Sequence, residues 1–268
     1  MSARSSSSTT GDRRPLAGRH ALVTGAVRGI GAACAKELAR PGATLTLAGR
    51  TLAPLEALAA SLASTGTSAQ VVTLDVTDQE GVRDAVARAR AAAPIDILVN
   101  NAGAVASAPL ARTDLALWER MLATNATGAY LCAQAVLPEM TRARWGRIVN
   151  VASTAGLRGY GYVTAYTAAK HALVGFTRAL ALEVARTGVT VNAVCPGYTE
   201  TEMLTGAASE ISRTTGRTLD ESRSELVKVN PQGRFVQPAD VAAAVGWLCL
   251  TEAGAITGAA IPVAGGEI

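Results

Sequence analysis

The stretch TGAVRGIG, from Thr24 to Gly31, decides the fold because it separates two unlike patterns. The short apolar run ALV precedes it, and a helical pattern rich in small residues follows it to about Arg40. A glycine-rich turn between a strand and a helix is the first half of a β-α-β unit. The sequence therefore predicts a strand at 20–24 that leads directly into a helix.

The same alternation continues along the chain and predicts one α/β domain. Strands alternating with helices form a doubly wound parallel sheet, here of about seven strands with helices on both faces. The length of 268 residues fits one such domain. Further strands are expected at 43–48, 70–74, 95–100, 147–152, 189–194 and 259–263, and helices at 51–64, 79–93, 114–123, 127–142 and 164–186.

Composition excludes several classes of function. Hydrophobic residues make up 49% of the chain but aromatic residues only 4%, so the core must consist of Ala, Val, Leu and Ile. The net charge is +4, and Arg4, Arg13, Arg14 and Arg19 account for much of it. No aromatic platform alternates with a basic stripe, so nucleic-acid binding is not expected.

Residues 1–17 are predicted to form a flexible leader rich in Ser and Arg, which precedes a domain at 18–268. The leader contains no apolar run, so neither an export signal nor a membrane anchor is expected. Cys34, Cys132, Cys195 and Cys249 lie far apart, without the paired spacing of a metal site. We expect four reduced, mostly buried thiols, no metal and a cytoplasmic location.

A connection of unusual length, at about 198–237, interrupts the alternation. Links between strands and helices are usually about 2–6 residues long, so this segment is expected to be functional. The sequence Thr218-Leu219-Asp220-Glu221 is typical of a capping box that opens a short helix, which ends before Asn230-Pro231. An ordered helix in an insertion predicts a lid over the substrate.

The glycine turn has the features of a phosphate site. Gly25 would allow the tight turn, Gly29 the close approach of a phosphate, and Gly31 close packing of helix on strand. The N–H groups at the start of a helix attract anions. A turn of this kind after the first strand predicts that a dinucleotide binds by its pyrophosphate.

The choice between NADP(H) and NAD(H) depends on the end of the second strand, which meets the adenosine ribose. An acid there would repel a 2′-phosphate, but the strand ends Ala48-Gly49-Arg50. Arg28 projects from the glycine turn as a second guanidinium. Two arginines near one ribose favour NADP(H), with NAD(H) left open.

Tyr166 and Lys170 are four residues apart on a predicted helix and share one face. A nearby ammonium should lower the pKa of a phenol toward working pH, where it exchanges protons best. Ser153 ends a predicted strand, and the ends of parallel strands are where such sheets place their sites. An isolated Tyr–Lys pair can be mere packing, but with Ser153 the three residues favour catalysis at a carbonyl.

These residues resemble the short-chain dehydrogenase/reductase family over about residues 16–268. The motifs that carry the resemblance occur in the family's order: Thr24 to Gly31, Asp75, Asn100-Asn101-Ala102-Gly103, Asn125, Ser153, Tyr166-Thr167-Ala168-Ala169-Lys170 and Pro196-Gly197. The resemblance implies a Rossmann-type domain that transfers hydride between a nicotinamide and a ketone or secondary alcohol.

The resemblance also implies roles for individual residues. Tyr166 would be the acid/base, Ser153 would orient the carbonyl, Lys170 would hold the nicotinamide ribose, and Asn125 would support a water relay. Asp75 would contact the adenine, Asn101 the adenosine side, and the backbone near Thr199 the carboxamide. The implied cofactor contacts are Gly25, Arg28, Gly29, Ile30, Gly31, Arg50, Asp75, Val76, Asn101, Ala102, Gly103, Tyr166, Lys170, Pro196, Gly197 and Thr199.

The resemblance further implies a homotetramer with the 164–186 helix at one interface. Ala264-Gly265-Gly266 stands where many relatives carry an acidic residue before the glycines, which puts a role for that position in subunit contact in doubt. Tyr160 and Tyr162 lie between Ser153 and Tyr166, where they would either line the substrate pocket or face solvent.

Two substrate classes remain open. The stretches 185–192 and 233–235 resemble 3-oxoacyl-thioester and polyketide ketoreductases, which favours a 3-oxoacyl thioester of acyl carrier protein or coenzyme A. The alternative is a broad carbonyl reductase or secondary alcohol dehydrogenase for bulky or cyclic ketones. A binding protein that only senses the cofactor should have lost Tyr166 or Lys170, and both are present.

Overall fold

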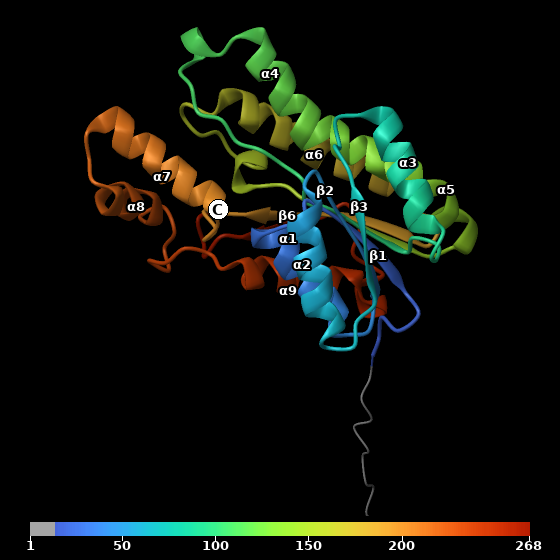
Figure 1. Cartoon of the computed structure of the whole chain (residues 1–268). Coiled ribbons are helices and arrows are strands. Elements are labelled where there is room, and N and C mark those ends of the chain that lie inside the picture. Colours follow the sequence, from blue (N-terminus) through green and yellow to red (C-terminus); the bar gives the residue numbers. More distant parts are fainter. Residues whose placement is uncertain (1–13) are drawn as a thin grey trace, which may run out of the picture.

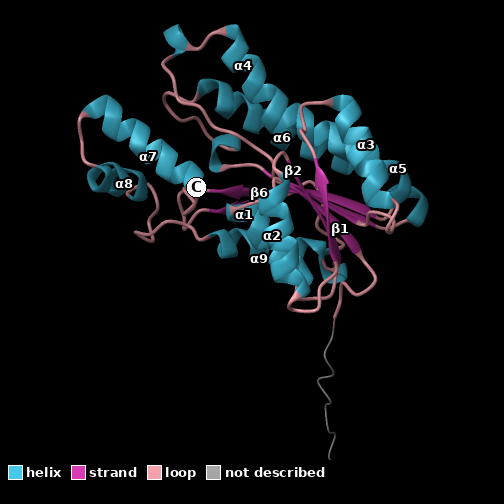
Figure 2. Cartoon of the chain, in the orientation of Figure 1, coloured by secondary structure: helices cyan, strands magenta, loops and turns pink. Residues whose placement is uncertain are grey.

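The computed structural model describes residues 14–268, and within them seven parallel strands form one sheet (Figure 2). The sheet order is β3-β2-β1-β4-β5-β6-β7. Most of the predicted leader, residues 1–13, lies outside the described residues. The strands are β1 His20–Thr24, β2 Thr44–Gly49, β3 Ala69–Thr73, β4 Ile97–Asn100, β5 Gly146–Val151, β6 Val189–Pro196 and β7 Ala260–Val263.

Helices cover both faces of the sheet (Figure 1). Helices α1, α2 and α9 pack on one face, and α3, α5 and α6 on the other. Helices α7 and α8 stand apart, beyond the end of β6 (Figure 1). The helices are α1 Gly29–Ala39, α2 Leu52–Ala63, α3 Gln79–Arg90, α4 Leu115–Leu122, α5 Gly128–Ala143, α6 Thr164–Glu183, α7 Glu202–Thr215, α8 Leu219–Val227 and α9 Pro238–Cys249.

Strand β1 shows how the sheet is buried on both sides. Ala21 and Val23 belong to the core on the face of α1 and α9, whereas Leu22 belongs to the core on the other face. Successive side chains of a strand point to opposite faces, so a strand covered on both faces must be apolar throughout. Both cores consist mainly of Ala, Val, Leu and Ile, as the composition predicts.

Strand β1 pairs with β2 on one side and with β4 on the other. Strands β2 and β3 are added outward on the first side and β4 to β7 on the second, so the strand order reverses between β1 and β4. The crevice at such a reversal is where doubly wound sheets bind ligands. The hydroxyl oxygen of Thr24, at the end of β1, accepts hydrogen bonds from the backbone N–H groups of Asn101 and Ala102. These bonds fix the glycine turn beside the turn that follows β4.

The predicted fold class is confirmed, with element ends that differ by a few residues. The two helices expected at 114–123 and 127–142 are joined by a π-helical turn, Ala123–Thr127, so they form one continuous helical run. The predicted capping box is present, because Thr218 and Glu221 each accept a bond from the other's backbone N–H. Helix α7 was not predicted. It buries only Leu204 and Ala208, which is too few apolar positions to give a clear helical pattern in the sequence.

Among residues 14–268, no helix is long and apolar enough to cross a membrane. The same residues contain no group of three or more His, Cys, Asp or Glu side chains placed to hold a metal ion. All four cysteines are free and buried, as expected.

Candidate active site

The glycine turn adopts the backbone that its sequence predicts. Gly25 and Gly29 have φ angles of +63° and +54°, a region that residues with a Cβ rarely enter. A Cβ on Gly31 would overlap the carbonyl oxygen of Gly25, and one on Gly25 would lie 2.9 Å from the Asn101 amide nitrogen. All three glycines are therefore required by space or by conformation.

The start of α1 is open to an anion. Its N-cap residue, Arg28, is extended and caps no backbone N–H with its side chain, and the first turn of the helix carries no acid. The first N–H groups of the helix thus lack a protein acceptor, and the helix dipole favours negative charge at that point. This cradle fits a pyrophosphate.

Asn101 supports the glycine turn from the neighbouring strand. Its amide nitrogen donates to the carbonyl oxygens of Thr24 and Gly25, each at 3.0 Å. Both bonds hold the backbone of the glycine turn in place, so the Asn101 side chain stabilises the shape of the proposed phosphate site. The direct adenosine contact implied by the family resemblance stays a prediction.

A hollow of about 410 Å³ lies where β2 and β3 end, and Arg50, Leu74 and Asp75 line it. Hydrogen bonds from the Thr77 side chain and backbone lower the pKa of Asp75, and the nearby charge of Arg50 lowers it further. The Asp75 carboxylate is therefore ionised near neutral pH and accepts hydrogen bonds. Arg50 and Asp75 thus lie in one hollow, and their contacts with a cofactor stay predictions.

Arg28, in contrast, pairs with the insertion. Its guanidinium lies 2.5 Å from a carboxylate oxygen of Glu202, the first residue of α7, and each side chain is 68% exposed. The N-cap residue of α7, Thr201, also lies against the turn, with its methyl carbon 3.1 Å from the position of a Cβ on Gly29. Helix α7 thus begins directly over the glycine turn.

The predicted catalytic residues meet at the carboxyl end of β5. Ser153 follows β5 and hydrogen-bonds to the phenol of Tyr166 on α6. Lys170 lies one helical turn farther along α6, with its nitrogen 5.7 Å from the centre of the Tyr166 ring. That nitrogen donates to the carbonyl oxygen of Val151 at 2.9 Å. The Lys170 ammonium thus contacts both the Tyr166 ring and the end of β5.

Burial dominates the protonation of these groups. It raises the pKa of Tyr166, although the hydrogen bond with Ser153 acts in the opposite direction. Burial lowers the pKa of Lys170 to about 8. The expected fall of the Tyr166 pKa toward working pH is wrong for this structure, because burial disfavours the phenolate more than the neighbouring groups favour it. Near neutral pH Tyr166 therefore holds its proton.

Asn125 occupies the π-helical turn and is 1% exposed. Its amide oxygen accepts from the backbone N–H of Ala104, and its amide nitrogen donates to the carbonyl oxygens of Ala104 and Met121. A Cβ on Gly103 would lie 2.9 Å from that amide oxygen and 3.7 Å from the Lys170 nitrogen. Asn125, Gly103 and Lys170 are thus neighbours, and the water relay stays a prediction.

The end of β6 completes the site. Pro196 is the last residue of the strand, and the N–H of Gly197 continues the ladder by donating to the carbonyl of Val263. Thr199 is buried, with its hydroxyl donating to the carbonyl of Gly197 at 2.9 Å. Cys195 lies beneath the site, and burial raises the pKa of its thiol to about 11, so it is a neutral core group as expected.

Comparison with known proteins agrees with this geometry. A family model described as short chain dehydrogenase matches residues 19–212. This chain belongs to the short-chain dehydrogenase family. It is 40% identical to the 3-oxoacyl-[acyl-carrier-protein] reductase FabG of Pseudomonas aeruginosa over 254 residues, which cover 94% of this chain and 98% of that protein.

Two solved structures share the fold of this short-chain dehydrogenase. An actinorhodin polyketide ketoreductase variant solved with NADPH has a TM-score of 0.90 and 38% identity, and the match covers 93% of this chain and 97% of that one. Levodione reductase has a TM-score of 0.89 and 31% identity, and the match covers 94% and 98%. The chain is thus an oxidoreductase of this family.

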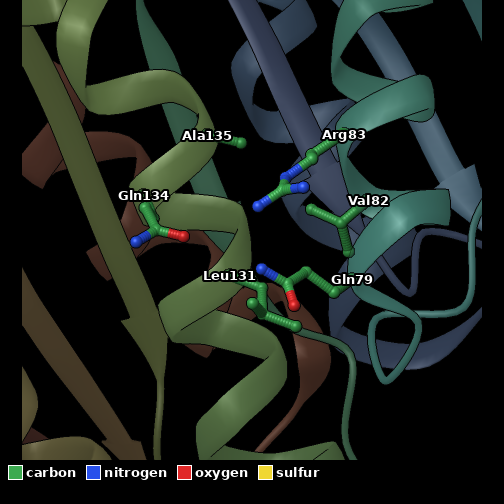
Figure 3. Close-up of a pocket in the computed structure, with 6 residues that line it drawn as sticks. All are labelled: Gln79, Val82, Arg83, Leu131, Gln134 and Ala135. Atoms are coloured by element: carbon green, nitrogen blue, oxygen red, sulfur yellow. The ribbon is translucent and has the colours of Figure 1, made fainter.

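A second hollow, of about 280 Å³, lies between α3 and α5 and contains none of the predicted site residues (Figure 3). Figure 3 shows the side chain of Arg83 extending from α3 toward α5. Gln79, Val82, Arg83, Leu131, Gln134 and Ala135 line it. It is separate from the carboxyl ends of β1, β4 and β5, and we assign it no role in the chemistry.

Sequence reasoning missed Glu267, which lies after β7 and contacts the loop that follows Ser153. Its carboxylate forms an ion pair with Arg158 at 3.0 Å and accepts a hydrogen bond from the phenol of Tyr160. Tyr160 was expected either to line the pocket or to face solvent, and it is instead half-buried in this cluster. No motif marks Glu267, because its partners are more than 100 residues away in the sequence.

The substitution Gly31→Ala should damage the cradle of this dehydrogenase. A Cβ there overlaps the Gly25 carbonyl, so the turn must shift, and we expect binding of NADPH and NADH to weaken at least about tenfold. Fluorescence titration of both cofactors measures this. The control is Gly175→Ala on α6, where an added Cβ would meet no atom within 4 Å beyond its own stretch of helix, and binding should not change. Equal binding by the two variants would contradict the assignment of the turn.

Proposed function

We propose that this enzyme reduces a ketone to a secondary alcohol with NADPH, and that its substrate is a 3-oxoacyl thioester of acyl carrier protein or coenzyme A. The observation that carries the proposal is the half-buried phenol of Tyr166, which keeps its proton and hydrogen-bonds to Ser153 beside Lys170. Such a group is set to donate a proton to an oxygen that gains negative charge.

The chain's own residues supply the proton and hold the carbonyl. Bound NADPH supplies the hydride that the carbonyl carbon receives. Ser153 donates a hydrogen bond to the carbonyl oxygen and draws it toward Tyr166. Tyr166 then gives its proton to that oxygen, and the charge of Lys170 lowers the cost of the phenolate that remains. Run in reverse, Tyr166 removes the proton of the alcohol.

The proposed cofactor fits the residues present. The glycine turn and the open start of α1 would hold the pyrophosphate, and Arg50 at the end of β2 would pair with a 2′-phosphate, with Asp75 beside the adenine. Lys170, Gly103 and the Pro196–Thr199 segment would surround the nicotinamide end. The NADPH-bound ketoreductase structure supports this choice.

Substrate choice rests on the relatives. The FabG protein named above acts on 3-oxoacyl groups of acyl carrier protein, as its name states, and this supports a thioester. The alternative is a broad carbonyl reductase or secondary alcohol dehydrogenase for bulky or cyclic ketones, and the likeness to levodione reductase favours it.

The segment at 198–237 is proposed to act as a lid, since α7 begins over the glycine turn. The homotetramer with α6 at an interface also stays a prediction, as does the cytoplasmic location. Exposed apolar side chains on α5 and α6, such as Tyr130 and Leu182, are compatible with such an interface.

Steady-state rates test the function. With NADPH, acetoacetyl-coenzyme A should be reduced faster than simple and cyclic ketones, and Tyr166→Phe should lower kcat at least about a thousandfold because the proton donor is lost. The control is Tyr130→Phe on α5, whose exposed phenol should not matter. Turnover by Tyr166→Phe at the rate of Tyr130→Phe would refute the mechanism, and a negligible thioester rate would favour the alternative substrate.

Arg50→Asp should reverse the cofactor preference. A carboxylate at the end of β2 repels a 2′-phosphate and accepts from a 2′-hydroxyl, so the ratio of kcat/KM for NADPH to that for NADH should fall at least about a hundredfold. Arg83→Asp on α3 makes the same change of charge away from this hollow and should leave the ratio unchanged. An unchanged ratio in Arg50→Asp would remove Arg50 from the 2′-phosphate site.

The rate of reduction should fall as pH rises through about 8, the lowered pKa of Lys170. Below that pH the lysine is charged and supports the phenolate, whereas above it the charge is lost. The pH profile of kcat/KM for NADPH reports the free enzyme and measures this. Arg is charged at all these pH values, so Lys170→Arg, though slower, should show no decline between pH 8 and 9. A wild-type profile that stays flat to pH 9.5 would contradict this role of Lys170.

A further inference from the structure

The side chain of Glu267 is 1% exposed, although it is a carboxylate in the segment after β7. Burying a charge is costly unless the charge is paired and hydrogen-bonded. A buried carboxylate is therefore maintained by specific partners. The two partners of Glu267, Arg158 and Tyr160, both belong to the loop between Ser153 and Tyr166.

Arg158 binds Glu267 twice. One guanidinium nitrogen lies 3.0 Å from the carboxylate, and the other donates to the backbone carbonyl of Glu267 at 3.3 Å. The guanidinium also stacks over the Tyr160 ring, 4.7 Å from its centre. The backbone N–H of Arg158 donates to the carbonyl of Thr154, so the arginine is tied to the start of its own loop.

Tyr160 extends the connection to the catalytic serine. Its phenol donates to the Glu267 carboxylate, which can only accept. Its oxygen lies 2.7 Å from the hydroxyl oxygen of Thr154, so the threonine hydroxyl is the donor in that bond. Thr154 is 4% exposed and follows Ser153 directly, in a short 3-10 turn that the Ser153 hydroxyl caps.

The other carboxylate oxygen of Glu267 faces the end of β6. A Cβ on Gly197 would lie 2.7 Å from it, and the Gly197 N–H donates to the carbonyl of Val263, shortly before Glu267. Glu267 is therefore wedged between the loop that holds Ser153 and the segment at the end of β6. These are the two sides of the proposed carbonyl site.

We propose that Glu267 is a positioning residue for ketone reduction, which fixes Ser153 against the end of β6 through Tyr160 and Thr154. The proposal rests on the proposed function, because it gives Ser153 the task of holding the carbonyl oxygen. A catalytic hydrogen bond depends on placement of its groups within about 0.5 Å. The loop after β5 therefore needs fixed contacts to hold the Ser153 hydroxyl within that tolerance. Glu267 itself touches neither substrate nor cofactor.

Graded variants test this role in the full-length enzyme. Glu267→Ala removes both partners' acceptor, and we expect kcat to fall at least about tenfold while KM for NADPH stays within about twofold. Glu267→Gln keeps an acceptor for Tyr160 and should recover part of the lost kcat. The control is Glu252→Gln, an exposed glutamate of the same carboxyl-terminal region, which should match the wild type.

Tyr160→Phe covers the case in which Glu267→Ala does not fold, because it breaks the same connection and leaves the Arg158 ion pair in place. It should lower kcat in the same way. Arg158→Gln combined with Glu267→Gln should be no slower than the slower single variant, since both act through one connection. A kcat in Tyr160→Phe within about twofold of the Glu252→Gln control would overturn the proposal.

Amide hydrogen exchange gives a readout that does not depend on activity. Exchange at residues 155–158 should accelerate in Glu267→Gln and Tyr160→Phe, and not in Glu252→Gln, because the 3-10 turn loses its tie. Unchanged exchange would overturn the proposal. A wild-type enzyme that reduces no ketone would refute the proposed function instead, and exchange would still show whether Glu267 holds the Ser153 loop.

Discussion

The parallel pairing of β4 with β1 on one side and β5 on the other is the constraint on which the site depends. Parallel strands end at the same edge, so the turns after β1 and β4 and the serine after β5 meet there. The bonds from Asn101 and Ala102 to the Thr24 hydroxyl lock the first two turns together. A change of register in this part of the sheet would separate the cradle from the catalytic residues.

Burial in this sheet edge also sets the chemistry. Tyr166, Lys170 and Cys195 all have pKa values shifted toward their neutral forms, and desolvation is the largest cause for each. Near neutral pH the phenol therefore keeps its proton, and the amine, whose pKa is about 8, is mostly charged, so a proton donor and a positive charge lie together. The carbonyl of Val151 compensates Lys170 for its burial and holds it below the ring.

The outer wall of the site is held by interactions of two different strengths. Arg28 with Glu202 connects α7 to the glycine turn, and Arg223 with Glu200 at 2.7 Å connects α8 to the residues just before α7, but these side chains keep contact with solvent. Exposed ion pairs contribute about 0–1 kcal/mol, so these two pairs do little to hold the segment in place. The ion pair of Glu267 with Arg158 is different, because the carboxylate is buried. Loss of Arg158 would leave that buried charge without its ion-pair partner.

The sequence by itself determined the sheet, the glycine turn and the Tyr166–Lys170 spacing, because local periodicity and glycine chemistry act over a few residues. The sequence also placed Arg50 after the second strand, and the family resemblance added Asp75, but the order of the strands that brings both into one hollow belongs to the folded sheet. Only the tertiary structure decided that Arg28 pairs with Glu202, that burial raises the pKa of Tyr166, and that Glu267 reaches the Ser153 loop. Those outcomes depend on desolvation and on contacts between distant segments, and neither leaves a pattern in the sequence.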